Sequence, residues 1–299
     1  MAIKMVKFMI EGILPAIITP FDEEGNVEFK YLKDVVNFQM RKGVHGFFVC
    51  GSAGEGALMS TEQRKTVAEA VLNEVKGRVP IIVHVGSTNT NEAVELAKHA
   101  NTIGAAAVGA ITPFYFKPDL EGLIEHYRSI AKAISIPVFI YNIPRLSGFN
   151  VTPDIARKIC SIENVIGIKD SSESLVQIQE IIETVPKHII VINGTDTLLF
   201  EALMAGVRGQ ISNVANVIPE LMVDIYDSYK KGEYNKALHL QFKVNAVKRI
   251  LEGLPISPVK AALELRGVKA GFPKRPLRPL SAEEVETLKE RLISLNLFW

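Results

Sequence analysis

Two residues in this sequence combine a nucleophilic amine with a proton donor. Lys169 closes the apolar run Val165–Lys169, and Tyr141 closes a similar run 28 residues earlier. An amine at the end of so apolar a segment is poorly hydrated, which disfavours its charged form. A neutral amine is the nucleophile that condenses with a ketone to form an imine. A tyrosine beside it can move the protons that imine formation and carbon–carbon bond chemistry require.

An isolated lysine more often has a structural role. Here Lys169 could pair with Asp170 or Glu55, or it could be a surface residue whose ammonium group reaches solvent. Tyr141 argues against that role, because it and the lysine end neighbouring apolar runs and are expected to meet. Ser52 and Tyr115 also follow such runs and could extend a hydroxyl relay from Tyr141 to solvent. We therefore favour a catalytic amine with Tyr141, Ser52 and Tyr115 as its proton relay.

Other chemistries are poorly supported by the residues at the ends of these runs. The six histidines show no metal-ligand spacing, and Glu55, Asp170 and Asp196 do not form the facing carboxylate pair that glycoside hydrolysis uses. Imine chemistry itself needs neither a metal nor a cofactor, because the imine is the electron sink. Cys50 and Cys160 have no ligand spacing and cannot build a disulfide framework, which favours a reducing cytoplasm.

The elements that must position these residues alternate along the chain. Short, continuous apolar runs are typical of parallel strands covered on both faces, and they alternate here with amphipathic stretches. The predicted strands are Ile13–Thr19, His45–Cys50, Pro80–Val85, Ala107–Ile111, Ile136–Tyr141, Val165–Lys169, Ile189–Asn193 and Gly209–Ser212. Eight such steps predict an α/β fold, the (β/α)8 TIM barrel, whose catalytic groups lie at the C-terminal ends of its strands. No G-x-G-x-x-G follows the first run, which disfavours a doubly wound dinucleotide-binding sheet.

The pattern divides the chain into two parts. Residues 1–225 are predicted to form the barrel with the catalytic site, and residues 226–299 a C-terminal helical extension. Capping residues indicate where helices of the barrel begin: Ser60 followed by Gln63 predicts a capping box at the start of a helix.

Composition excludes several classes of partner. The 299 residues are 47% hydrophobic and 22% charged with a net charge of +1, which gives no electrostatic reason to expect nucleic acid or an anionic membrane. No apolar stretch is long enough to span a bilayer, and the first residues lack the pattern of a signal peptide. We expect a cytoplasmic enzyme that acts on small molecules.

Several motifs in order resemble the dihydrodipicolinate synthase / N-acetylneuraminate lyase family. The resemblance is collinear from about Gly12 to Leu280. The motifs that carry it are Thr19-Pro20-Phe21, Gly51-Ser52-Ala53-Gly54-Glu55, Tyr141-Asn142-Ile143-Pro144, Gly167-Ile168-Lys169-Asp170 and Pro258-Val259-Lys260. The resemblance implies a (β/α)8 barrel with a C-terminal helical extension, assembled as a homotetramer, a dimer of dimers.

The resemblance also implies a role for individual residues. Lys169 would form the Schiff base with pyruvate, and Tyr141 would be the general acid and base. Ser52 and the backbone amides of Ser52 and Ala53 would bind the keto-acid carboxylate. Tyr115 would complete the relay, in many members by reaching into the neighbouring subunit.

Ile211 and Leu146 would shape the pocket, and Leu146 departs from the family pattern. Ile211 would pack against the bound keto acid. Synthases of the family carry an arginine five residues after the catalytic tyrosine, and it pairs with the carboxylate of aspartate semialdehyde; Leu146 stands there. Arg145 is adjacent, but along an extended segment a shift of one residue turns a side chain the other way.

The motif around Leu146 resembles members that act on sugar acids, whereas Ser212–Asn216 and Pro258–Ala261 resemble the synthases. On balance we expect reversible cleavage of a 2-keto-3-deoxy sugar acid to pyruvate and an aldehyde. The alternatives are 4-hydroxy-tetrahydrodipicolinate synthase, which condenses pyruvate with aspartate semialdehyde, and N-acetylneuraminate lyase. A barrel that binds keto acids without catalysis is a further alternative.

Overall fold

The computed structural model describes residues 9–297, and its centre is a sheet of eight parallel strands. The strands are β1 Gly12–Pro15, β2 Phe47–Val49, β3 Ile81–His84, β4 Ala107–Ile111, β5 Val138–Asn142, β6 Val165–Asp170, β7 Ile190–Asn193 and β8 Gly209–Ser212. They follow one another around the sheet, with β1 beside β8. Between β1 and β2 the sheet is closed by a parallel bridge from Ala16 to Phe48. The predicted (β/α)8 barrel is confirmed.

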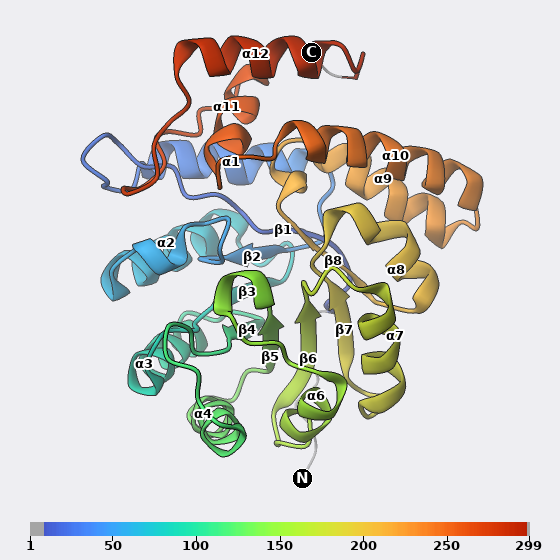
Figure 1. Cartoon of the computed structure of the whole chain (residues 1–299). Helices are drawn as coiled ribbons and strands as arrows, with labels where there is room; N and C mark the ends of the chain where they lie inside the picture. The colour runs from blue at the N-terminus through green and yellow to red at the C-terminus, as the bar shows by residue number, and fades with distance from the viewer. Residues whose placement is uncertain (1–8, 298–299) are drawn as a thin grey trace.

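Helices alternate with the strands and surround the barrel (Figure 1). They are α1 Phe29–Arg41, α2 Thr61–Val75, α3 Thr90–Thr102, α4 Leu120–Lys132, α5 Pro144–Ser147, α6 Pro153–Ile159, α7 Leu175–Thr184, α8 Leu199–Ala205 and α9 Pro219–Lys230. Single 3₁₀ turns, η1 Gly56–Leu58, η2 Asp196–Leu198 and η3 Val214–Asn216, lie in the loops after β2, β7 and β8. Ser60 and Gln63 form the predicted capping box at the start of α2, each side chain bonding the other's backbone amide.

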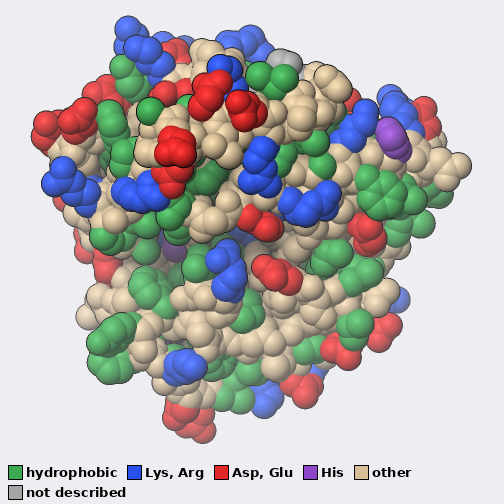
Figure 2. All heavy atoms as spheres, turned by 45° about the horizontal axis from the view of Figure 1, so that its top comes forward, with side chains coloured by type: hydrophobic (Ala, Val, Ile, Leu, Met, Phe, Trp, Pro, Cys, Tyr) green, Lys and Arg blue, Asp and Glu red, His purple; other side chains and the backbone are tan. Residues whose placement is uncertain are grey.

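The chain ends in three further helices, α10 Tyr234–Ile250, α11 Ser257–Leu265 and α12 Ala282–Ile293. In Figure 1 they lie together at the top of the molecule, near α1 and α9. Figure 2 shows basic and acidic side chains interspersed over the face turned towards the viewer, in keeping with the net charge of +1. Among residues 9–297, no helix combines the length and the apolar character needed to cross a bilayer.

Several observed strands are shorter than the apolar runs that predict them, and the difference is largest for β1 and β2. β2 ends at Val49 because Cys50 adopts a left-handed conformation with φ of +59°, which a strand cannot continue. β1 ends at Pro15, yet the next residues still follow the barrel, since the Ile17 amide donates to the Phe48 carbonyl at 3.1 Å. The apolar run is therefore a good guide to the buried segment and a poorer guide to strand ends.

A buried ion pair joins the C-terminal helices to the loop after β2. Lys260 of α11 lies 2.7 Å from Glu55, and both side chains are at most 3% exposed. The Lys260 ammonium also donates to the carbonyls of Thr19 and Phe272, at 2.8 and 2.6 Å. The backbone amide of Lys274 donates to the second Glu55 oxygen at 2.6 Å. The loop that carries Ser52 and Ala53 is thus held at one end by the C-terminal part of the chain.

Replacing Lys260 with methionine is expected to lower the free energy of unfolding by about 3–5 kcal/mol, because it leaves the Glu55 carboxylate buried without its cation. Urea denaturation measures the loss. Lys236→Met is the control: that lysine pairs with Glu233 at 3.1 Å, but the two side chains are 59% and 47% exposed. An exposed pair contributes at most about 1 kcal/mol. Equal losses in the two variants would contradict a stabilising role of the buried pair.

Candidate active site

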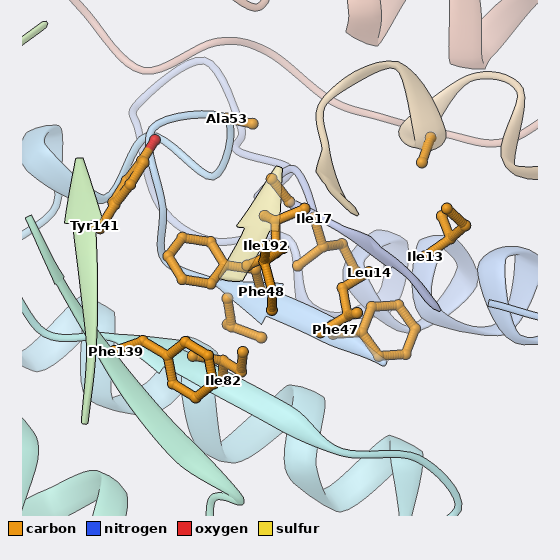
Figure 3. Close-up of a cluster of buried hydrophobic side chains, with 14 of the residues drawn as sticks. Ile13, Leu14, Ile17, Phe47, Phe48, Ala53, Ile82, Phe139, Tyr141 and Ile192 are labelled. Atoms are coloured by element: carbon orange, nitrogen blue, oxygen red, sulfur yellow. The ribbon is translucent and has the colours of Figure 1, made fainter. Parts of the chain in front are cut away.

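The structure brings Lys169 and Tyr141 together at the C-terminal end of the barrel. The two residues are register partners on β6 and β5, and both side chains are buried. The Lys169 Nζ lies 4.0 Å from the centroid of the Tyr141 ring and 4.8 Å from that of Phe48 on β2. Figure 3 shows Phe48 inside the barrel and the Tyr141 ring rising beside it towards the loops. The predicted pair of amine and phenol therefore lies side by side among buried aromatic rings.

Lys169 forms no ion pair within residues 9–297, so it is not the ion-pair partner of Asp170 or Glu55 there. Asp170 follows it on β6, and successive side chains of a strand point to opposite faces. The Asp170 carboxylate accepts hydrogen bonds from Asn142 at 2.7 Å and Gln177 at 2.9 Å. Glu55 is engaged by Lys260. Within residues 9–297, the Lys169 Nζ thus lies against aromatic rings and pairs with no carboxylate.

Gly194 leaves the space that the lysine occupies. A Cβ atom at Gly194 would lie 2.8 Å from Cε of Lys169 and would overlap Oγ of Ser171. These two atoms therefore lie against the same face of the glycine. The Ser171 hydroxyl is buried and has no hydrogen-bond partner in the described part of the chain. It is a polar group beside Lys169 that a bound molecule could satisfy.

The Tyr141 hydroxyl meets the loop after β2. Its Oη lies 3.2 Å from Oγ of Ser52, and either group can donate. In Figure 3 the hydroxyl points towards the loop that carries Ala53. This loop begins at Cys50 and ends at Glu55, both with φ of +59°, a region that non-glycine residues rarely adopt. Left-handed residues at both ends of a short loop are local strain of the kind that clusters at ligand-binding sites.

The remaining predicted site residues lie at different distances from this centre. Ile211 is buried on β8 beside Leu14 of β1, where it can line the barrel interior. Leu146 lies on α5 and is half exposed. Tyr115 is 85% exposed with φ of +75°, and its ring packs edge-on against Phe116. Within residues 9–297, no hydrogen bond joins Tyr115 to Ser52 or Tyr141, so one chain alone does not complete the predicted relay.

The segment that carries Arg145 and Leu146 is helical, and the expectation of an extended segment is wrong. α5 spans Pro144–Ser147, and the amides of Leu146 and Ser147 both donate to the Ile143 carbonyl at 3.0 Å. Successive side chains of a helix are separated by about 100° and do not point in opposite directions. Arg145 is largely exposed, with Nε 4.0 Å from a Glu173 carboxylate oxygen. It is therefore available on the same turn as Leu146.

Sequence reasoning missed His84, whose ring packs against Tyr141, and Arg64, which is hydrogen bonded to the His84 backbone. His84 is the last residue of β3, and its ring centroid is 5.7 Å from that of Tyr141 at an interplanar angle of 87°. Burial and the neighbouring Arg64 guanidinium hold the pKa of His84 well below its usual range. Histidine spacing carries no signal of this arrangement. The position of His84 at the end of the predicted strand Pro80–Val85 is the feature that could have revealed it.

The site brings together a buried amine, a phenol and a serine hydroxyl. In the described residues, no three or more histidine, cysteine, aspartate or glutamate side chains are grouped to hold a metal ion. A (β/α)8 barrel with a buried lysine near the end of β6, a tyrosine against it and a serine hydroxyl beside the phenol is typical of one class of enzyme. This class is the carbon–carbon lyases and synthases of the class I aldolase type.

Comparison with known proteins gives the family within that class. Residues 9–295 match the model of the Dihydrodipicolinate synthetase family. The 4-hydroxy-tetrahydrodipicolinate synthase of Archaeoglobus fulgidus is 38% identical over 291 residues, which are 97% of this chain and 99% of that protein. Relatives of the same name from other archaea and from bacteria are 35–39% identical. The chain belongs to the dihydrodipicolinate synthetase family.

Solved structures of the family superpose closely on this one. YagE, a prophage protein of the dihydrodipicolinic acid synthase family from E. coli K12 solved in complex with pyruvate, has a TM-score of 0.93 and 30% identity. The alignment covers 97% of this chain and all of YagE. CdNal from Clostridium difficile, solved in complex with mannosamine, has a TM-score of 0.92 and 30% identity, over 96% of this chain and all of CdNal.

Proposed function

We propose that this chain joins or cleaves carbon–carbon bonds through a Schiff base between Lys169 and pyruvate. The amine adds to the C2 carbonyl, and loss of water gives the imine. Departure of a proton from C3 then gives an enamine, whose C3 attacks the carbonyl carbon of an aldehyde. Hydrolysis of the new imine releases the product and the free lysine. The observation that carries this proposal is the position of the Lys169 amine, 4.0 Å from the centroid of the Tyr141 ring and unpaired with any carboxylate of the described residues.

The neighbouring residues have distinct tasks in this proposal. Tyr141 carries protons to and from the carbinolamine and C3, and its 3.2 Å contact with Ser52 connects it to the relay. The amides of Ser52 and Ala53 bind the pyruvate carboxylate at the strained loop, and Ile211 packs against the methyl group. Tyr115, exposed on its own chain, completes the relay of a neighbouring subunit in a homotetramer. Its 85% exposure and left-handed backbone are consistent with a residue that projects from the chain.

Aspartate semialdehyde is the first candidate for the aldehyde. The names of the curated relatives favour this synthase reaction over the sugar-acid cleavage that Leu146 suggested from the sequence. The helical form of α5 also removes the objection to Arg145, since its guanidinium lies on the same turn as Leu146. We assign to Arg145 the recognition of the semialdehyde carboxylate, for which a bidentate guanidinium is suited.

Cleavage of a 2-keto-3-deoxy sugar acid is the second candidate, and Leu146 favours it. This apolar side chain stands where the family resemblance places the arginine of the synthases. Ser171, whose buried hydroxyl has no hydrogen-bond partner within residues 9–297, is a candidate to bind a substrate hydroxyl. Two values of kcat/KM decide between the candidates: one for the condensation of pyruvate with aspartate semialdehyde, and one for the cleavage of 2-keto-3-deoxygluconate. Efficient turnover of the sugar acid with none of the semialdehyde would overturn the first candidate.

Replacing Arg145 with leucine is expected to raise KM for aspartate semialdehyde roughly tenfold, because a charged hydrogen bond to the substrate carboxylate is lost. KM for pyruvate should not change. Steady-state kinetics with each substrate varied in turn measures both values. Arg128→Leu, which removes an exposed arginine of α4 that pairs with Glu125, is the control. An unchanged KM in Arg145→Leu, with a gain of semialdehyde condensation in Leu146→Arg, would show that position 146 selects the aldehyde.

A further inference from the structure

His84 connects three parts of the site through one buried imidazole. Its Nδ1 lies 3.0 Å from the carbonyl oxygen of Cys50, the left-handed residue that begins the loop with Ser52. Its Nε2 lies 3.4 Å from the amide nitrogen of Ile111 at the end of β4. Its ring meets the Tyr141 ring nearly at right angles. His84 is only 6% exposed, so these contacts are made away from solvent.

The hydrogen bonds define the protonation of the ring. The Ile111 amide can only donate, so Nε2 accepts and carries no proton. The proton is then on Nδ1, which donates it to the Cys50 carbonyl at 3.0 Å. In this tautomer the Arg64 Nη2, 3.3 Å from Nδ1, is a contact and not a hydrogen bond, because both groups are donors. The imidazole is therefore neutral and in a single tautomer, as its depressed pKa also indicates. In this form it cannot serve as a general acid without losing one of the two contacts.

Arg64 of α2 fixes the backbone on which the histidine stands. Its guanidinium donates to the carbonyl of His84 at 2.8 Å and to that of Gly86 at 3.0 Å. Arg64 is 4% exposed, and no ion pair of Arg64 is present in residues 9–297. Burying a cation is costly unless hydrogen bonds satisfy its donors, and here backbone carbonyls accept from the guanidinium. Here it holds the end of β3, and hence the direction in which the His84 ring projects.

The Tyr141 ring is confined on two sides by this arrangement. Phe48 meets it edge-on at a centroid distance of 5.4 Å, and His84 does so at 5.7 Å. With Lys169 above its face, the ring has little freedom to turn, and the hydroxyl is directed towards Ser52. The same imidazole thus limits the tyrosine through its ring and the loop through its Nδ1 hydrogen bond.

We propose that His84, oriented by Arg64, is a positioning residue with two separable tasks: its ring aligns Tyr141 for proton transfer, and its Nδ1 hydrogen bond shapes the carboxylate-binding loop at Cys50. This inference rests on the proposed pyruvate Schiff base. The two tasks predict two different kinetic defects, because alignment of Tyr141 acts on the rate of proton transfer and the loop acts on pyruvate binding.

Two substitutions separate the tasks. His84→Phe keeps a ring against Tyr141 and Phe48 but loses the hydrogen bond to Cys50. His84→Asn keeps a donor that can reach the Cys50 carbonyl but loses the ring. His126→Phe is the matched control, because His126 is also a buried histidine, hydrogen bonded to Thr90 on the outer helices.

Exchange of the pyruvate methyl hydrogens for deuterium in heavy water, followed by proton NMR, measures the site without an aldehyde. Each exchange requires imine formation, loss of a C3 proton and its return from solvent. His84→Phe is expected to raise KM for pyruvate roughly tenfold, with kcat within about threefold of the unmodified protein. His84→Asn is expected to lower kcat roughly tenfold, with KM within about threefold. His126→Phe should change neither constant by more than about threefold.

The outcomes distinguish this inference from the proposed function. An absence of exchange in the unmodified protein would overturn both. If the unmodified protein catalyses exchange but His84→Phe and His84→Asn change kcat and KM in the same way as each other, the positioning role alone would be overturned. Thermal melting of all variants is followed in parallel, because a purely structural role lowers the melting temperature without splitting kcat from KM.

Discussion

Replacing Lys169 with methionine is expected to lower kcat/KM by at least roughly a thousandfold, because the nucleophile that forms the imine is lost. Methionine fills a similar volume, so the packing against Tyr141 and Phe48 should persist. Borohydride reduction in the presence of pyruvate, followed by peptide mass spectrometry, locates the imine. The unmodified protein should acquire a three-carbon adduct at Lys169, and the variant should acquire none there.

Lys169→Arg is the companion variant, since it places a permanent positive charge at this position but offers no nucleophilic amine. It should be as inactive as Lys169→Met. Residual activity in the arginine variant would mean that the cation acts electrostatically and that the covalent step is wrong. An adduct on another lysine of the unmodified protein would likewise contradict the assignment.

Replacing Tyr141 with phenylalanine is expected to lower kcat by about 10²–10⁴, the usual contribution of a general acid or base. The ring stays, and with it the contacts to Phe48, His84 and the Lys169 amine. Only the hydroxyl and its 3.2 Å contact with Ser52 disappear. Stopped-flow or NMR assays of pyruvate hydrogen exchange should show the full loss, whereas borohydride should still trap the slowly formed imine.

Tyr127→Phe is the matched control for the loss of a buried phenol. Tyr127 is fully buried on α4, and its hydroxyl donates to the Ala110 carbonyl at 2.9 Å. Its loss should cost about 1 kcal/mol of stability and leave kcat nearly unchanged. Similar kcat values in the two tyrosine variants would show that the Tyr141 hydroxyl does not transfer the proton.

The local sequence contained signals for α5 that the expectation of an extended segment overlooked. Pro144 stands at the first helical position, where proline is favoured because its missing amide would have no partner. Gly148 ends the turn with φ of +68°, the left-handed conformation that favours glycine at a helix end. Reading these two residues as start and stop signals predicts a turn of helix. The orientation of Arg145 relative to the pocket follows from that turn.

Two other features depended on contacts that no local pattern contains. Tyr115 lies just after β4, as predicted, but the loop carries it outward to 85% exposure. His84 appeared as one of six histidines without ligand spacing. Its partners come from segments 20 to 34 residues away in the chain: Arg64 on α2, Cys50 after β2 and Ile111 on β4. Such pairings arise only when the barrel closes.

The sequence by itself determined the barrel and the Lys169–Tyr141 pair, because parallel strands of a closed barrel bring their C-terminal ends together whatever the details of packing. Apolar runs ending in an amine and a phenol on neighbouring strands therefore suffice to predict imine chemistry. Only the tertiary structure decided which carboxylates were already engaged, how Arg145 and Leu146 share one turn, and what holds Tyr141 in place. These features depend on side-chain directions and long-range contacts, which are fixed when the helices and loops pack around the strand ends.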